Sequence, residues 1–147
     1  MNLISHQINS LSGEVICPGD KSISQRILII GFLLNSRMEV KGFLDAEDPN
    51  STLIALNGIG ASIKKDNGLI YLSKRDDYFK SPSKDLNLGN SGTGMRLILG
   101  LISGLGINAT LVGDQSLTNR PMYRVIDPLE AMGVEIESND GMAPIKI

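Results

Sequence analysis

The chain of 147 residues repeats one order of predicted elements, and the two copies are offset by about 70 residues. In each copy, a loop rich in small and hydroxyl-bearing residues leads into an apolar helix that carries an arginine, Arg26 in the first and Arg96 in the second. Each copy ends with a hairpin whose turn contains Asn, Asp and Gly, at 66–68 and 139–141. We therefore predict an α/β fold built from two tandem βαβαββ units.

We divide the chain into residues 1–17, a first unit at 18–85 and a second unit at 86–147. The first unit is expected to contain helices at 22–35 and 49–57 and strands at 38–44, 61–65 and 69–73. The second is expected to contain helices at 91–105 and 120–132 and strands at 85–88, 107–112, 134–137 and 144–147. Short strands are also expected at 3–8 and 14–17. Because a repeated unit needs neighbours to cover its apolar face, we expect a third unit to follow and regard the chain as incomplete.

The composition argues against several classes of protein. A net charge of −2 and a pI near 5.3 argue against nucleic-acid binding, which requires a basic surface. The single cysteine, Cys17, excludes an internal disulfide and a cysteine-rich metal site. No apolar run approaches the roughly 18 residues of a membrane span, and the N-terminus lacks the features of a secretory signal. We expect a cytoplasmic protein that binds no metal, membrane or nucleic acid.

The first loop, at 18–26, is suited to binding an anion. Lys21 precedes the predicted helix, and Ser22 and Arg26 have i, i+4 spacing, so they lie on one helical face. A hydroxyl, an ammonium and a guanidinium group thus meet at a helix N-terminus, where the helix dipole favours negative charge. The alternative is that Ser22 caps the helix and Arg26 forms a surface ion pair. We favour the anion site, because the helix after Arg26 has almost no polar face.

The second loop, at 89–96, is rich in glycine but matches no nucleotide-binding motif. Arg96 stands in the segment where a P-loop requires Lys followed by Ser or Thr, and Leu97 stands where a dinucleotide fingerprint has its third glycine. The backbone N–H groups of 90–93 are expected to form a nest that binds an anion. An ordinary strand-to-helix turn remains the alternative. Together, the two loops predict two anionic groups bound side by side.

Three motifs are spread along the chain. They are Pro-Gly-Asp-Lys-Ser-Ile-Ser-Gln-Arg at 18–26, Leu-Gly-Asn-Ser-Gly-Thr-Gly-Met-Arg at 88–96 and Gly-Asp-Gln-Ser-Leu-Thr-Asn-Arg-Pro-Met at 113–122. In sequence and order they resemble the 5-enolpyruvylshikimate-3-phosphate synthase family, whose enzymes are much longer, so the chain looks like their N-terminal third. The resemblance implies two lobes of three βαβαββ units each, with this chain supplying two units of one lobe. Residues 1–17 would then be strands of the other lobe.

The resemblance also implies a reaction and a set of binding residues. The enzyme would transfer the enolpyruvyl group of phosphoenolpyruvate to the 5-hydroxyl of shikimate 3-phosphate and release phosphate, without a metal or organic cofactor. By motif, shikimate 3-phosphate is assigned to Lys21, Ser22 and Arg26, and phosphoenolpyruvate to Lys21, Asn90, Gly92 and Arg120. The residues that transfer protons would lie beyond residue 147. Glyphosate would inhibit the intact enzyme, and Gly92→Ala would weaken that inhibition.

Two alternatives belong to other functions. A sister enolpyruvyl transferase acts on UDP-N-acetylglucosamine and shares the fold, but it has Asn after the loop lysine and a cysteine near an Arg-Pro pair. Here Ser22 follows Lys21, and no cysteine occurs at 113–121. The other alternative is a fragment that binds substrate without turnover. We expect the chain alone to be inactive and to require the C-terminal remainder of the same enzyme as its partner.

Overall fold

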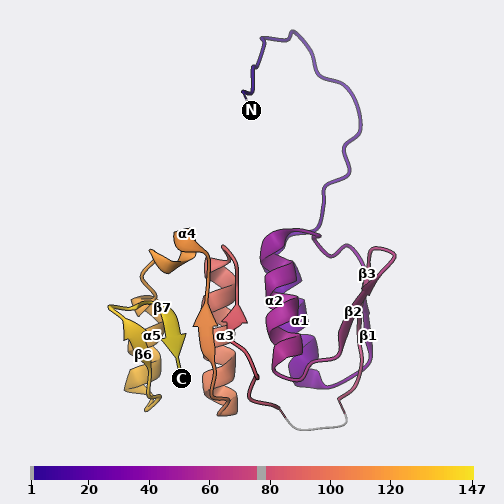
Figure 1. The fold of residues 1–147 in the computed structure, drawn as a ribbon. Helices are drawn as coiled ribbons and strands as arrows, with labels where there is room; N and C mark the ends of the chain where they lie inside the picture. Colours follow the sequence, from indigo (N-terminus) through magenta and orange to yellow (C-terminus); the bar gives the residue numbers. More distant parts are fainter. Residues whose placement is uncertain (1, 76–78) are drawn as a thin grey trace.

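The computed structural model describes residues 2–75 and 79–147, and Figure 1 shows two α/β halves that follow one another along the chain. The first half contains α1 (Lys21–Leu34), β1 (Met38–Val40), α2 (Glu47–Gly58), β2 (Ile63–Asp66) and β3 (Leu69–Leu72). The second contains β4 (Leu86–Asn87), α3 (Gly92–Leu105), β5 (Thr110–Val112), α4 (Gln115–Thr118), α5 (Tyr123–Ala131), β6 (Glu137–Asn139) and β7 (Met142–Lys146).

Both halves contain a sheet with the same order of strands, which confirms the predicted repeat. The order is β1-β3-β2 in the first half and β4-β5-β7-β6 in the second, so β5, β7 and β6 correspond to β1, β3 and β2. The shared strands are antiparallel, and β4 adds a parallel strand next to β5. The second half therefore follows the βαβαββ plan, and the described residues of the first half repeat it from the first helix onward, without a counterpart of β4.

The hairpin turns have the geometry that their residues predict. Asn67 and Gly68 have φ angles of 48° and 77°, and Asp140 and Gly141 have φ angles of 53° and 70°. Two successive left-handed residues are typical of a type I′ turn, in which Asn or Asp followed by Gly is favoured. The turn residues thus account for the tight connections β2–β3 and β6–β7.

The strands expected at 3–8 and 14–17 do not form. Residues 2–17 contain neither helix nor strand and extend away from the folded body (Figure 1). A lone strand leaves its backbone N–H and C=O groups without partners. In the second half the first strand, β4, has such a partner, because it pairs with β5. Residues 2–17 pair with no strand. Large apolar side chains of the segment, including those of Leu3 and Ile16, are exposed for the same reason.

Several boundaries also differ from prediction: the strand expected at 38–44 ends at Val40, and the one expected at 107–112 begins at Thr110. The helix expected at 120–132 begins later as α5, because the short helix α4, capped by Asp114, precedes it. The strand expected at 134–137 begins at Glu137. The N–H of Val134 donates to a carbonyl in the last turn of α5 and so cannot join a β-ladder.

One continuous apolar core joins the two halves. It includes the fully buried side chains of Leu28 in α1, Leu56 in α2 and Ile98 in α3. Because α2 packs against both α1 and α3, it is the element that connects the halves. The opposite side of α1 leaves Ile23 and Ile30 exposed. Among the described residues, no helix is both long and apolar enough to cross a membrane.

Candidate functional site

Three helices begin next to one another, and a buried glutamine joins their N-terminal regions. Gln25 of α1 is fully buried, and its Nε2 donates to Thr52 Oγ1 of α2 and to Ser91 Oγ at the start of α3, both at 2.9 Å. The first and second loops therefore lie side by side. Sequence reasoning assigned no role to Gln25 in this contact. The signal that could have revealed it is a polar residue on the buried stripe of an apolar helix.

The first loop gathers its polar side chains at the start of α1. Asp20 caps the helix through a hydrogen bond of 2.7 Å from a backbone N–H of the first turn, so the Ser22 hydroxyl is not used as the cap. Lys21 Nζ lies 2.9 Å from Asp48 Oδ2 of α2. Arg26 Nη1 donates to Ser22 O at 3.1 Å, which directs the guanidinium back toward the loop. Lys21 and Arg26 are both exposed and can meet an anion there.

The second loop offers fewer backbone donors than the predicted nest. Ser91 Oγ caps α3 by accepting from Gly94 N at 3.0 Å. The N–H groups of Ser91 and Gly92 donate within the loop, at 2.9 and 3.1 Å, to the carbonyls of residues 88 and 90. They are therefore occupied by the turn itself. In the loop as the structure describes it, Asn90 and Thr93 retain the N–H groups that an anion could use.

Two guanidinium groups flank Gly92. Arg96 Nη1 donates to Gly92 O at 3.1 Å and its Nη2 to Pro121 O at 3.4 Å. Arg120 Nη2 donates to Asn90 Oδ1 at 2.6 Å. A Cβ atom added at Gly92 would lie 3.1 Å from Arg96 Nη1 and 3.5 Å from Arg120 Nη1. The three residues that the resemblance assigns to phosphoenolpyruvate beside Lys21 thus lie together.

A carboxylate supports this cluster from one side. Asp114 accepts from Leu117 N and from Asn90 Nδ2, both at 2.7 Å, and these hydrogen bonds lower its pKa. Guanidinium groups at helix starts bind and orient anions such as phosphate or carboxylate. Within the described residues, no group of three or more His, Cys, Asp or Glu side chains is placed to hold a metal. The two guanidinium groups beside Gly92 make the arrangement suited to binding anions.

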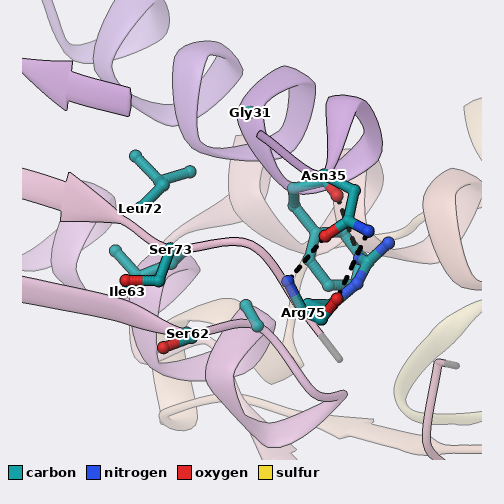
Figure 2. Close-up of a pocket in the computed structure, with 9 residues that line it drawn as sticks. Gly31, Asn35, Ser62, Ile63, Leu72, Ser73 and Arg75 are labelled. Atoms are coloured by element: carbon teal, nitrogen blue, oxygen red, sulfur yellow. Dashed lines mark hydrogen bonds between the residues drawn. The ribbon is translucent and has the colours of Figure 1, made fainter. Parts of the chain in front are cut away.

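A second polar cluster, at the other end of α1, holds the chain in place. Figure 2 shows Arg75 beside Asn35, whose Oδ1 accepts from Arg75 N at 2.7 Å. The Arg75 guanidinium lies 4.3 Å from the Phe32 ring centroid and 4.2 Å from that of Phe79, and burial lowers its pKa. The adjoining cavity of about 10 Å³ is at the lower limit for one water molecule. We assign this cluster no ligand, because its contacts hold the segment after β3 against the end of α1.

Comparisons with known proteins agree with the three motifs. The family model for EPSP synthase (3-phosphoshikimate 1-carboxyvinyltransferase) matches residues 5–147. The chain is 48% identical over 141 residues to the 3-phosphoshikimate 1-carboxyvinyltransferase of Ruthia magnifica subsp. Calyptogena magnifica. It is 43% identical over 148 residues to that of Oenococcus oeni. These alignments cover 95% and 99% of this chain but 32% and 34% of the relatives, so the chain spans about a third of their length.

The fold is also that of a solved enzyme. The structure of EPSP synthase from Acinetobacter baumannii matches with a TM-score of 0.78 and 36% sequence identity, covering 92% of this chain and 31% of the other. The two α/β halves and the loops that begin α1 and α3 are therefore parts of a known architecture. By its family match, its relatives and its fold, the chain belongs to the EPSP synthase family.

Proposed function

We propose that this chain is a substrate-binding part of an EPSP synthase, which transfers the enolpyruvyl group of phosphoenolpyruvate to the 5-hydroxyl of shikimate 3-phosphate and releases phosphate. This reaction belongs to the shikimate pathway to chorismate and the aromatic amino acids. The observation that carries the proposal is the hydrogen bond from Gln25 to Ser91, which holds two cation-bearing helix starts side by side. Two adjacent anion sites suit two phosphorylated substrates.

Each loop takes one substrate in this proposal. Shikimate 3-phosphate is bound by Lys21, Ser22 and Arg26, and phosphoenolpyruvate by Asn90, Gly92 and Arg120, with Lys21 contacting both. Because both substrates carry phosphate groups, they repel one another until nearby cations offset their charge. Ammonium and guanidinium groups at helix N-termini supply that charge and orient the substrates for reaction.

The reaction needs charge stabilisation as well as proton transfer. The 5-hydroxyl oxygen loses its proton and bonds to C2 of phosphoenolpyruvate, while C3 gains a proton. The resulting tetrahedral intermediate releases phosphate by cleavage of its C2–O bond, and loss of a proton from C3 restores the double bond. Cations placed around the phosphate stabilise the charge that develops as it leaves. We assign the proton transfers to the rest of the enzyme.

The partner of the chain in this proposal is the remainder of the same enzyme. We assign residues 1–17 to the other lobe, which would cover apolar side chains such as those of Leu3 and Ile16. No nucleic acid or membrane takes part. We place the enzyme in the cytoplasm, where the exposed Cys17 thiol would remain reduced.

A reconstitution assay tests the proposed function. The chain alone, and the chain mixed with the separately produced remainder of the Oenococcus oeni relative, are incubated with both substrates, and released phosphate is measured. Size-exclusion chromatography shows whether the two pieces assemble. We expect release from the assembled mixture when both substrates are present, and none from the chain alone.

The other outcomes decide between the alternatives. An assembled mixture that releases no phosphate contradicts the proposed function. Release with UDP-N-acetylglucosamine in place of shikimate 3-phosphate supports the sister transferase. Release by the chain alone contradicts our expectation that the remainder is required.

A further inference from the structure

Asp114 begins a series of hydrogen bonds that ends at the guanidinium group of Arg120. Asp114 Oδ2 accepts from Asn90 Nδ2 at 2.7 Å, and Asn90 Oδ1 accepts from Arg120 Nη2 at 2.6 Å. The same guanidinium nitrogen donates to Ser116 Oγ at 3.0 Å. The backbone reinforces the arrangement, because Asp114 N donates to Gly89 O at 2.9 Å. Asp114 and the second loop are thus joined through both side chain and main chain.

The carboxylate determines which way the Asn90 amide faces. An ionised Asp side chain only accepts hydrogen bonds, whereas an Asn side chain has a donor end and an acceptor end. With Asp114 Oδ2 on one side, the NH₂ group of Asn90 faces Asp114 and its carbonyl oxygen faces Arg120. The reversed amide would place acceptor against acceptor on one side and donor against donor on the other.

This orientation matters because Arg120 is exposed and long. An arginine without partners spreads over many rotamers, and ordering it on binding costs conformational entropy. The hydrogen bond to Asn90 keeps the guanidinium near Gly92, where an added Cβ would lie 3.5 Å from Nη1. A cation that is already in position binds an anion more tightly than one that must be ordered.

We propose that Asp114 is a positioning residue for phosphoenolpyruvate, because it orients Asn90 and thereby holds Arg120 beside Gly92. The proposal rests on the proposed function. It predicts that removing the Asp114 carboxylate changes the affinity for phosphoenolpyruvate in the direction opposite to that expected from charge alone. A carboxylate near an anion site repels the ligand, so charge alone predicts tighter binding once the carboxylate is removed. Positioning predicts weaker binding.

The variant Asp114→Asn separates these two effects. Asn is as good an N-cap as Asp, so the new amide oxygen can accept from Leu117 N, as Asp114 Oδ1 does at 2.7 Å. Its NH₂ group then faces Asn90, whose amide turns over and presents its own NH₂ to Arg120. Arg120 Nη2 then keeps Ser116 Oγ but loses its shorter hydrogen bond, to Asn90 Oδ1, so we expect the KM for phosphoenolpyruvate to rise about tenfold. The KM for shikimate 3-phosphate should stay within about twofold.

Two further variants control this comparison, with all kinetics measured on the chain assembled with the Oenococcus oeni remainder. Asp114→Glu keeps a side chain that only accepts and should restore most of the affinity for phosphoenolpyruvate. Asp140→Asn removes a carboxylate from the hairpin turn, where it accepts from Tyr123 OH at 2.5 Å, and should change neither KM. A KM for phosphoenolpyruvate that is unchanged or lower in Asp114→Asn overturns the proposal and leaves the proposed function intact.

NMR of the 147-residue chain gives a readout that needs no catalysis. The relaxation of the Arg120 Nε–H group measures how ordered the guanidinium is, and the dispersion of backbone signals shows that each variant is folded. We expect Arg120 to lose order in Asp114→Asn and to keep it in Asp140→Asn. Equal order in the wild type and Asp114→Asn overturns the proposal. An assembled enzyme that does not use phosphoenolpyruvate overturns the proposed function, and this measurement still decides whether Asp114 positions Arg120.

Discussion

The two loops share a plan but obtain their exposed guanidinium group from different places. In each, an arginine donates to the carbonyl four residues earlier at 3.1 Å, Arg26 in the first loop and Arg96 in the second. Arg26 is exposed, whereas Arg96 is half-buried and also reaches the carbonyl of Pro121. The second loop therefore presents Arg120, which comes from the segment between α4 and α5.

The equivalent positions Gln25 and Met95 show the same divergence inside the core. Both side chains are fully buried. Met95 belongs to the apolar core, whereas Gln25 donates across the boundary between the halves to Ser91. The comparison teaches that the repeat preserves the helix start and its arginine, while the neighbouring elements decide which side chain is available to a ligand.

Replacing the exposed arginine of one loop at a time with alanine gives the largest expected effect and tests this comparison directly. In the assembled enzyme, Arg120→Ala should lower kcat/KM for phosphoenolpyruvate roughly 100-fold, because it removes a charge-assisted hydrogen-bond donor. Its KM for shikimate 3-phosphate should change by less than about threefold. Arg26→Ala should show the reverse pattern. Steady-state kinetics with each substrate varied in turn checks both, and variants that impair both substrates equally contradict the assignment of one substrate to each loop.

A smaller effect is expected where the first loop has Ser24 and the second has Gly94. A Cβ at Gly94 would lie 2.7 Å from Ser91 Oγ and 3.1 Å from Gln25 Nε2, so Gly94→Ala should destabilise the chain by about 1–3 kcal/mol. The control is Gly104→Ala in the same helix, where nothing lies within 4 Å, and which should stabilise it by about 0.5–1 kcal/mol. Urea unfolding of the 147-residue chain measures both. Equal effects of the two substitutions would show that the Gln25 contact is loosely packed.

The parts of the fold that depend on local signals were predictable. The turns at 66–68 and 139–141 and the helices α1 and α3 follow from turn residues and apolar periodicity. The strands predicted at 3–8 and 14–17 do not form, because a strand needs a neighbouring strand to pair with. A sequence pattern within one segment carries no information about that neighbour.

The site could likewise be predicted where its residues are close in sequence, and not where it depends on packing between elements. Lys21, Ser22 and Arg26 are close in sequence, so helical spacing alone places them together. Arg120 joined Asn90 through the resemblance alone, because a separation of 30 residues fixes no geometry. The orientation that Asp114 gives the Asn90 amide and the inward direction of Gln25 both depend on contacts between elements. Such contacts become visible only when the elements are packed.

The glycine between the two guanidinium groups provides a third test. A methyl group at Gly92 would lie 3.1 Å from Arg96 Nη1, which must shift by a few tenths of an ångström, and in van der Waals contact with Arg120 Nη1 at 3.5 Å, where it fills the space between the two guanidinium groups. We expect Gly92→Ala to raise the KM for phosphoenolpyruvate and the inhibition constant of glyphosate about tenfold in the assembled enzyme, with shikimate 3-phosphate little affected. An unchanged inhibition constant for glyphosate would contradict this assignment of the second loop.

The smallest expected effect is the pH dependence of the hydrogen bond between Asp114 and Asn90. It distinguishes Asp114, the carboxylate beside the second loop, from the other carboxylates in the chain. Hydrogen bonds from Leu117 N and then from the Asn90 side chain lower the pKa of Asp114. A lowered pKa favours the charged form, so these bonds stabilise the fold above the ordinary Asp value of about 4. They are lost only as the pH falls through the lower folded value. The Asn90 side-chain NH₂ signals of the 147-residue chain should therefore shift with a midpoint below the ordinary range.

The amide of Asn50 supplies a matched comparison within the same spectra. It donates to Asp45 Oδ1 at 2.9 Å, and the pKa of Asp45 is lowered first by its hydrogen bond with Lys65 and then by Asn50. In Asp114→Asn the Asn90 transition should disappear while that of Asn50 persists. In Arg120→Ala the Asn90 midpoint should rise slightly, because the positive charge of Arg120 contributes to the lowered pKa of Asp114. An Asn90 midpoint that stays the same in all three proteins would mean that the amide senses another group, and the hydrogen bond between Asp114 and Asn90 would then not persist in solution.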